Sequence, residues 1–170
     1  MNIEELKVKA ENIVENIKDK GIYLKENTFI DYKLELKLNP NVGNVLIFLR
    51  NFAKDILAFA NKDGGLLLLG FNENKETGEI TDIGLKEDDI NILRAIDLKD
   101  LSDQFVKMFD AQIIVDIHAF NIATRKFYYI LIEKHNSILI PKNDFLDYGL
   151  KKGDIIYRSA GNNLKANERT

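Results

Sequence analysis

The sequence has no cysteine and no tryptophan, and it has only two histidines and two prolines among its 170 residues. The absence of cysteine excludes a disulfide framework, a zinc ribbon and a cysteine nucleophile. The two imidazoles, His118 and His135, are too few for a histidine-based metal site, and we expect them to be structural. Apolar runs in the middle of the chain, such as residues 66–69, are far too short to span a membrane.

What remains is the composition of one globular domain. Hydrophobic residues make up 45% and charged residues 30%, and 10 Phe with 6 Tyr can fill a core. Near the N-terminus, Glu4 and Glu5 stand where a signal peptide would carry basic and then apolar residues. We therefore expect a soluble, cytoplasmic protein that does not contact a membrane.

The charge is distributed unevenly along the chain. The net charge is −3, which argues against a protein that coats DNA unspecifically. Residues 121–170 nevertheless carry nine basic and five acidic side chains, so this third is +4 and the first 120 residues are −7. Such a basic segment can hold a phosphate backbone if its lysines share a face. Charge alone favours the simpler interpretation of an ordinary solvated surface.

Hydrophobic periodicity predicts a mixture of helices and strands. Steps of three and four predict helices over residues 2–20 and 45–60, and one or two helices over 86–110. Alternating or continuous apolar runs predict strands over residues 29–38, 66–71, 112–120, 126–133 and 154–157, with a loop or small hairpin over 72–84. The expected fold class is α/β (α+β): a single domain with a mixed β-sheet packed by helices, plus an N-terminal helix.

The first motif that could carry chemistry lies in the strand predicted over residues 29–38. Asp31 and Lys33 are two residues apart and should project from the same, polar face. A carboxylate and an ammonium at this spacing can hold a divalent cation and steady a phosphate, as in many metal-dependent nucleases. Glu35 and Lys37 continue the alternation of charge, which supports the alternative of a solvated strand face.

The second motif is the segment 58–73, in which a helix ends at Gly64-Gly65 and an apolar strand follows. The two glycines allow backbone conformations that side chains forbid, and Gly70 allows another backbone segment or a ligand to approach closely. The segment is not a Walker phosphate loop, because its glycines precede the strand and no Gly-Lys-Ser/Thr follows. It gives no support to an ATPase.

The third motif is the segment 156–166, where Arg158 leaves a strand and Ser, Gly and Asn follow. A guanidinium and backbone amides in this arrangement can bind a phosphate. The alternative is a turn that contains a salt-bridged arginine.

In this order, the three motifs resemble the Schlafen AlbA-like domain family. The family pattern is Glu-Ser, three variable residues and Glu-Phe-Lys, then Ala-Phe-Ala-Asn, Gly-Gly, an apolar strand and Gly-Val-Asp-Asp, and finally Tyr-Tyr-Arg. The corresponding segments here are 26–33, 58–73 and 156–166, and the middle one is the most specific. The resemblance begins after the first helix, so we expect an N-terminal extension over residues 1–24 and a Schlafen AlbA-like domain over 25–170.

The resemblance also implies a site. In Schlafen proteins that cut transfer or ribosomal RNA, three carboxylates form a metal-dependent nuclease site, and they correspond here to Glu26, Asp31 and Glu73. The resemblance thus implies that these acids bind Mg²⁺ or Mn²⁺, with Lys33 beside the scissile phosphate. The expected contacts to the flanking nucleic-acid backbone are, in sequence order, Lys33, Lys151, Lys152, Arg158 and Lys165.

Three functions stay open at this point. The chain is expected to be a nucleic-acid-binding module for RNA or DNA, or a metal-dependent endoribonuclease acting on structured RNA such as tRNA. The third alternative is a non-catalytic interaction or sensor domain of a larger transcriptional regulator or ATPase-like protein. The expected partners are accordingly nucleic acid, a second copy in a homodimer, and a C-terminal domain in a longer parent protein.

Overall fold

The computed structural model describes residues 1–24, 29–39, 41–159 and 161–166. Its centre is a four-stranded sheet in the order β1-β2-β6-β5. The strands are β1 (Ile30–Lys33), β2 (Gly65–Leu69), β5 (Val115–Ile122) and β6 (Arg125–Ile132). β1 runs parallel to β2, whereas β2 with β6 and β6 with β5 are antiparallel. The sheet is therefore mixed, as the sequence predicted.

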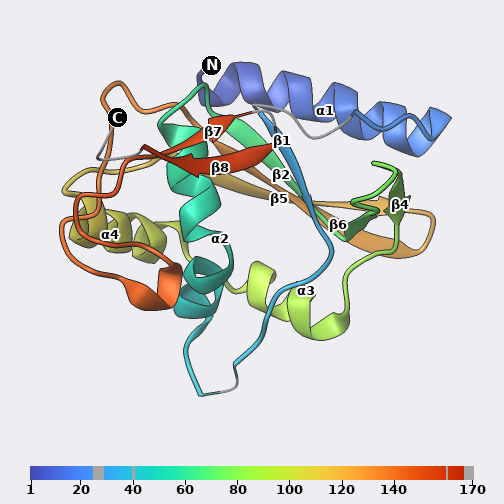
Figure 1. Ribbon diagram of the computed structural model, residues 1–170. Coiled ribbons are helices and arrows are strands. Elements are labelled where there is room, and N and C mark those ends of the chain that lie inside the picture. The colour runs from blue at the N-terminus through green and yellow to red at the C-terminus, as the bar shows by residue number, and fades with distance from the viewer. Residues whose placement is uncertain (25–28, 40, 160, 167–170) are drawn as a thin grey trace.

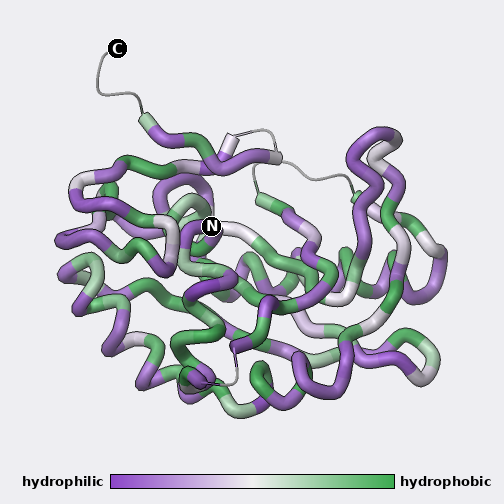
Figure 2. The backbone as a smooth tube through the Cα atoms, turned by 60° about the horizontal axis from the view of Figure 1, so that its bottom comes forward, coloured by the Kyte–Doolittle hydropathy of each residue, from purple (hydrophilic) through white to green (hydrophobic). Residues whose placement is uncertain are grey.

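Helices cover both faces of this sheet (Figure 1). They are α1 (Ile3–Lys20), α2 (Asn44–Ala60), α3 (Glu87–Arg94) and α4 (Leu98–Phe109), with a short 3₁₀ turn at Leu146–Tyr148. α1 packs on one face through five buried residues, namely Leu6, Ala10, Ile13, Val14 and Ile17. α2 and α4 bury their apolar stripes on the other face. Hydrophobic stretches run through the middle of the molecule (Figure 2).

β2 lies in the interior because its side chains are apolar on both faces. Leu66 and Leu68 join the core beneath α1, and Leu67 and Leu69 join the core against α2. A strand that is covered on both sides has no polar face, which explains the unbroken leucine run. The helix–turn–strand unit predicted for this segment is confirmed.

Two of the glycines singled out in the sequence lie at the ends of β2. Gly64 has φ = 77°, a left-handed conformation that lets α2 turn directly into the strand. Gly70 has φ = 106°, and a Cβ atom there would lie 2.6 Å from the Phe127 ring. Close packing across the sheet thus requires glycine at position 70.

Two small hairpins complete the fold. The first, β3 (Phe71–Glu73) with β4 (Ile80–Asp82), forms within the segment 72–84 that was predicted as a loop or small hairpin. The second is β7 (Ile156–Ser159) with β8 (Asn162–Lys165), and it packs against α2. The last strand was thus predicted two residues early, and its partner β8 was not predicted.

The strand predicted over residues 29–38 is wrong in its length and in its burial pattern. β1 covers only residues 30–33, because its partner β2 ends at Leu69 and Gly70 turns away. Leu34 and Leu38 are exposed although the alternation placed them in the core. Asp31, assigned to a solvated face, is instead 6% exposed. In the part of the chain that the structure describes, no helix is both long and apolar enough to cross a membrane.

Candidate functional site

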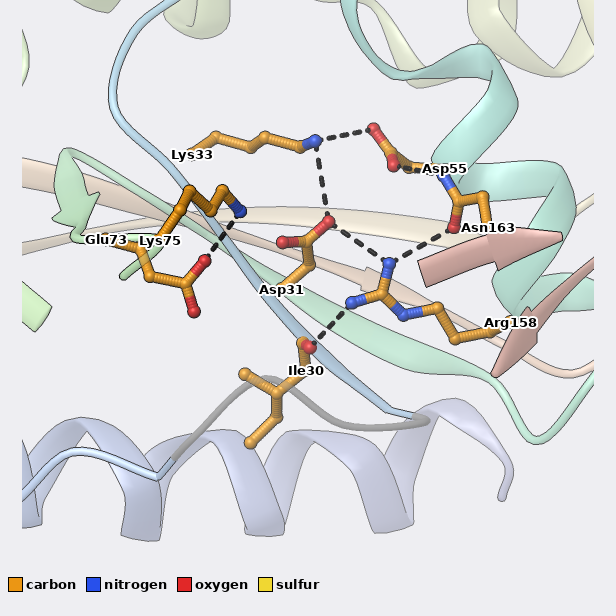
Figure 3. Close-up of polar contacts among 8 residues, drawn as sticks. All are labelled: Ile30, Asp31, Lys33, Asp55, Glu73, Lys75, Arg158 and Asn163. Carbon is orange, nitrogen blue, oxygen red and sulfur yellow. Dashed lines mark hydrogen bonds and ion pairs between the residues drawn. The ribbon is translucent and has the colours of Figure 1, made fainter. Parts of the chain in front are cut away.

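An open cleft of about 430 Å³ lies beside β1, between the β3–β4 hairpin and the β7–β8 hairpin. β1, α2 and both hairpins bring charged or amide side chains to it (Figure 3). The residues that carry the argument are Asp31, Lys33, Asp55, Glu73, Lys75, Arg158 and Asn163. The cleft is polar because β1, at the edge of the sheet, presents its charged residues to Asp55 on α2 and to both hairpins.

Asp31 and Arg158 form a buried ion pair at the base of the cleft. Asp31 Oδ2 lies 3.3 Å from Arg158 Nη1, and the Arg158 side chain is only 1% exposed. Arg158 Nη2 also donates to the Ile30 carbonyl over 3.1 Å, and Nη1 donates to Asn163 Oδ1 over 3.1 Å. Its guanidinium carbon lies 4.9 Å from the centroid of the Phe59 ring.

These contacts change the interpretation of Arg158. We predicted a phosphate contact, with a salt-bridged arginine in a turn as the alternative. The buried guanidinium has internal partners on β1 and β8, which is the geometry of the alternative. Arg158 therefore orients Asp31 and ties the hairpin to the sheet, and we do not assign it a contact with nucleic acid.

Lys33 bridges two carboxylates. Its Nζ atom lies 3.4 Å from Asp31 Oδ2 and 3.4 Å from Asp55 Oδ2, while its side chain stays 35% exposed. Burial lowers the pKa of Lys33, but the attraction of Asp55 and Asp31 outweighs burial and leaves this pKa above its usual value. The ammonium is therefore held charged and faces the cleft.

Asp55 belongs to the site, although the sequence analysis did not identify it. It lies on α2, accepts a 2.7 Å hydrogen bond from Asn163 Nδ2, and is buried. Burial raises the pKa of Asp55, and the nearby Lys33 ammonium opposes this shift. The sequence contains a signal for this role, because Asp55 shares one helix face with Phe48, Phe52 and Phe59. An acidic residue on an apolar stripe is buried and needs a polar or charged partner.

Glu73 reaches the same cleft from β3. Its Oε1 lies 2.6 Å from Lys75 Nζ, and the side chains are 13% and 79% exposed, respectively. Two of the three acids expected to converge, Asp31 and Glu73, therefore line one cleft. The third, Glu26, lies outside the described residues.

The sequence comparison identifies the family. The model of the family described as "Schlafen, AlbA_2" matches residues 26–167, which is most of the chain. The chain belongs to the Schlafen AlbA_2 family. α1 lies outside the matched residues, and it still packs on the sheet of the Schlafen fold. No curated protein matches the sequence significantly.

Two solved structures show the same fold. The DIP2311 protein from Corynebacterium diphtheriae is 20% identical with a TM-score of 0.55, and the match covers 96% of this chain but 30% of that one. The N-terminal domain of a RecG-related protein from Nitrosomonas europaea is 20% identical with a TM-score of 0.50, and the match covers 95% of this chain and 92% of that domain. The chain thus spans about a third of the first protein, and its counterpart in the second is one N-terminal domain.

Among the described residues of this Schlafen chain, no group of three His, Cys or acidic side chains could hold a metal ion. Asp31 already pairs with Lys33 and Arg158, and Glu73 pairs with Lys75. The described carboxylates do not form a three-ligand site by themselves. The predicted Mg²⁺ or Mn²⁺ site thus depends on Glu26.

Three other lysines predicted to contact nucleic acid do not line the cleft. Lys151, Lys152 and Lys165 are exposed, and Lys165 Nζ pairs with Asp154 Oδ1 over 3.3 Å. Lys165 is opposite Ile156 at the end of the hairpin away from the turn, whereas Asn162 and Asn163 at the turn end border the cleft. Asn162 and Lys165 are the two ends of the four-residue strand β8, so they lie roughly 10 Å apart along it.

The Asp55 carboxyl makes the stability of the fold depend on pH. Because its pKa is raised above 3.8 in the folded state, the folded chain binds more protons than the unfolded chain just above this pH. We expect the free energy of unfolding of the wild type, relative to Asp55→Asn, to fall as the pH rises above 3.8. Urea unfolding at a series of pH values measures this difference. A difference that rises with pH would contradict the assignment.

Proposed function

We propose that this domain binds nucleic acid in the cleft and holds a backbone phosphate between Lys33 and Lys75. The observation that supports this function is the convergence of two ammonium groups from different elements on one open cleft. Membership in the Schlafen AlbA_2 family supports the same class of ligand. The arrangement suits a phosphate because its charged oxygens can accept from both lysines at once.

Electrostatics indicates that this binding depends only modestly on salt, and phosphate contacts by themselves carry no sequence information. The described acids and bases of the cleft balance, so there is little excess positive charge to attract a polyanion. Affinity then depends on a few direct phosphate contacts. A longer strand that leaves the cleft along the β7–β8 hairpin reaches Lys151, Lys152 and Lys165, so affinity should increase with the length of the oligonucleotide.

Replacing Lys75 by glutamine tests this proposal. Each lost phosphate contact should reduce the slope of log K against log salt by about 0.7 for a single strand and 0.9 for a duplex. Fluorescence anisotropy with labelled RNA and DNA oligonucleotides at several salt concentrations measures both slopes. Lys99→Gln is the matched control, because Lys99 is equally exposed and pairs with an acid on α4. Equal slopes for the two variants would contradict the assignment of Lys75.

A second candidate function is metal-dependent RNA cleavage. It is favoured by one observation, that Asp31 and Glu73 line the same cleft although they are far apart in the sequence. The family resemblance adds Glu26 as the third carboxylate and Mg²⁺ or Mn²⁺ as the ion. The proposal is thus an endoribonuclease acting on structured RNA such as tRNA.

Glu73→Gln is the sharpest variant for this second candidate. Asp31 is a poor target, because its removal would leave Arg158 buried without its counter-charge. Glu73 pairs only with an exposed lysine among its described contacts, so the fold should tolerate the change. If the domain is a nuclease, the wild type cleaves tRNA with Mn²⁺ and Glu73→Gln loses on the order of a hundredfold in rate. Equal cleavage by both proteins would indicate contamination or another site.

A further inference from the structure

The strand β5 forms one edge of the four-stranded sheet. It is the last strand in the order, it is eight residues long, and no described strand pairs with its outer side. The opposite edge is different, because β1 is only four residues long and Arg158 donates to the Ile30 carbonyl from outside. Proteins usually protect long edge strands with proline, lysine or a bulge. The sequence of β5, Val-Asp-Ile-His-Ala-Phe-Asn-Ile, contains neither proline nor lysine.

The hydrogen-bond pattern shows which backbone groups of β5 point outward. In the antiparallel ladder with β6, Glu133 donates its N–H to the Ile114 carbonyl over 2.9 Å. Even-numbered residues of β5 therefore direct their backbone groups toward β6, and odd-numbered residues direct theirs to the outside. At one outward position the Ile117 N–H donates to the neighbouring Asp116 Oδ1 over 3.2 Å. The Asp116 carboxylate thus accepts the hydrogen bond that a backbone carbonyl of an added strand would accept.

We propose that β5 pairs antiparallel with β5 of a second copy of this chain, about a two-fold axis at Ile117. This register places Ile117 opposite itself and Val115 opposite Ala119, so only outward-facing residues exchange hydrogen bonds. The two four-stranded sheets then form one continuous sheet, and the two clefts lie at its far edges beside β1. This inference is independent of the proposed ligand of the cleft.

The pairing of Asp116 with His118 favours both the second copy and this register. Asp116 Oδ2 and His118 Nε2 lie 3.1 Å apart within one chain, on the same face of β5. Pairing about Ile117 sets Asp116 directly opposite His118 of the partner subunit, and the two-fold axis produces this contact twice. In the neighbouring register, centred on His118, the two imidazoles would lie opposite each other. Neither Asp116 carboxylate would then lie opposite an imidazole of the other subunit.

Sedimentation velocity across a concentration series tests the proposal with the whole chain. We expect a reversible dimer, and Ala119→Pro should weaken it on the order of thirtyfold, because two symmetry-related hydrogen bonds are lost. Proline is compatible with the monomer there, because the N–H of residue 119 faces away from β6. Asn121→Pro is the matched control, because residue 121 also faces outward but lies beyond the proposed ladder. A wild type that remains a monomer at about 1 mM would overturn the proposal.

An exchange of charges tests the register independently of proline. Asp116→Lys should weaken the dimer about tenfold, because an ammonium then faces His118 of the partner subunit. Adding His118→Glu to this variant restores opposite charges across the axis, and dimerisation should recover. If the double variant is as weak as the single one while both remain folded by circular dichroism, the register about Ile117 is wrong.

Discussion

Replacing Arg158 by methionine is expected to lower the free energy of unfolding by about 3 kcal/mol. The guanidinium is buried, it neutralises Asp31, and it donates to the Ile30 carbonyl. Methionine fills much of the volume but donates to neither oxygen, so the Asp31 carboxylate and the Ile30 carbonyl each lose one donor. Lys33 still pairs with Asp31 in this variant. The loss of unfolding free energy should therefore lie near the lower end of the range for a broken buried ion pair.

Urea unfolding followed by circular dichroism measures this change. Lys165→Met is the matched control, because its ion pair with Asp154 is partly exposed at the lysine and should contribute about 1 kcal/mol or less. The double variant Arg158→Met with Asp31→Asn should recover part of the loss, because no unpaired charge is then buried. A loss below 1 kcal/mol in the single variant would show that the pair does not hold the hairpin on the sheet.

Elements with a strong periodic pattern could be predicted from the sequence. α1 and α2 are within one residue of their predicted limits, because their apolar stripes face a single surface and glycine ends α1 in a left-handed cap. The predicted length of β1 was wrong, because a partner strand limits it and the local pattern does not. Its alternation of Leu and charged residues continues to position 38, but a strand extends only as far as its partner, and β2 ends at Leu69.

The site could be predicted only in part. Asp31, Lys33 and Glu73 line the cleft as expected, since the family motifs mark their positions. Asp55 was missed because its role arises from packing: α2 brings it beside Lys33, and local sequence does not encode that distance. The sequence also left the burial of Arg158 open, because an arginine in this motif can bind either a phosphate or a carboxylate inside the protein.

Asn61→Ala is the other change expected to have a large effect, about 3 kcal/mol of unfolding free energy. Asn61 follows α2 and is buried. Its Nδ2 donates to the carbonyls of Leu139 and Ile156 over 2.9 and 2.8 Å, and its Oδ1 accepts from Leu139 N over 2.8 Å. Alanine would leave these buried backbone groups without their partner. Since Ile156 begins β7, the change should also loosen the strand that carries Arg158.

Asn51, which lies within α2, offers a matched control. Its amide makes an equivalent set of three backbone contacts, two with Lys37 and one with Ile47, but those with Lys37 are exposed. Water can replace exposed hydrogen bonds, so Asn51→Ala should cost about 1 kcal/mol. The ratio of the two losses, measured by urea unfolding, isolates the effect of burial. Equal losses would mean that the amide of Asn61 contributes no more than a surface hydrogen bond, and that the hairpin is held by Arg158 and apolar packing instead.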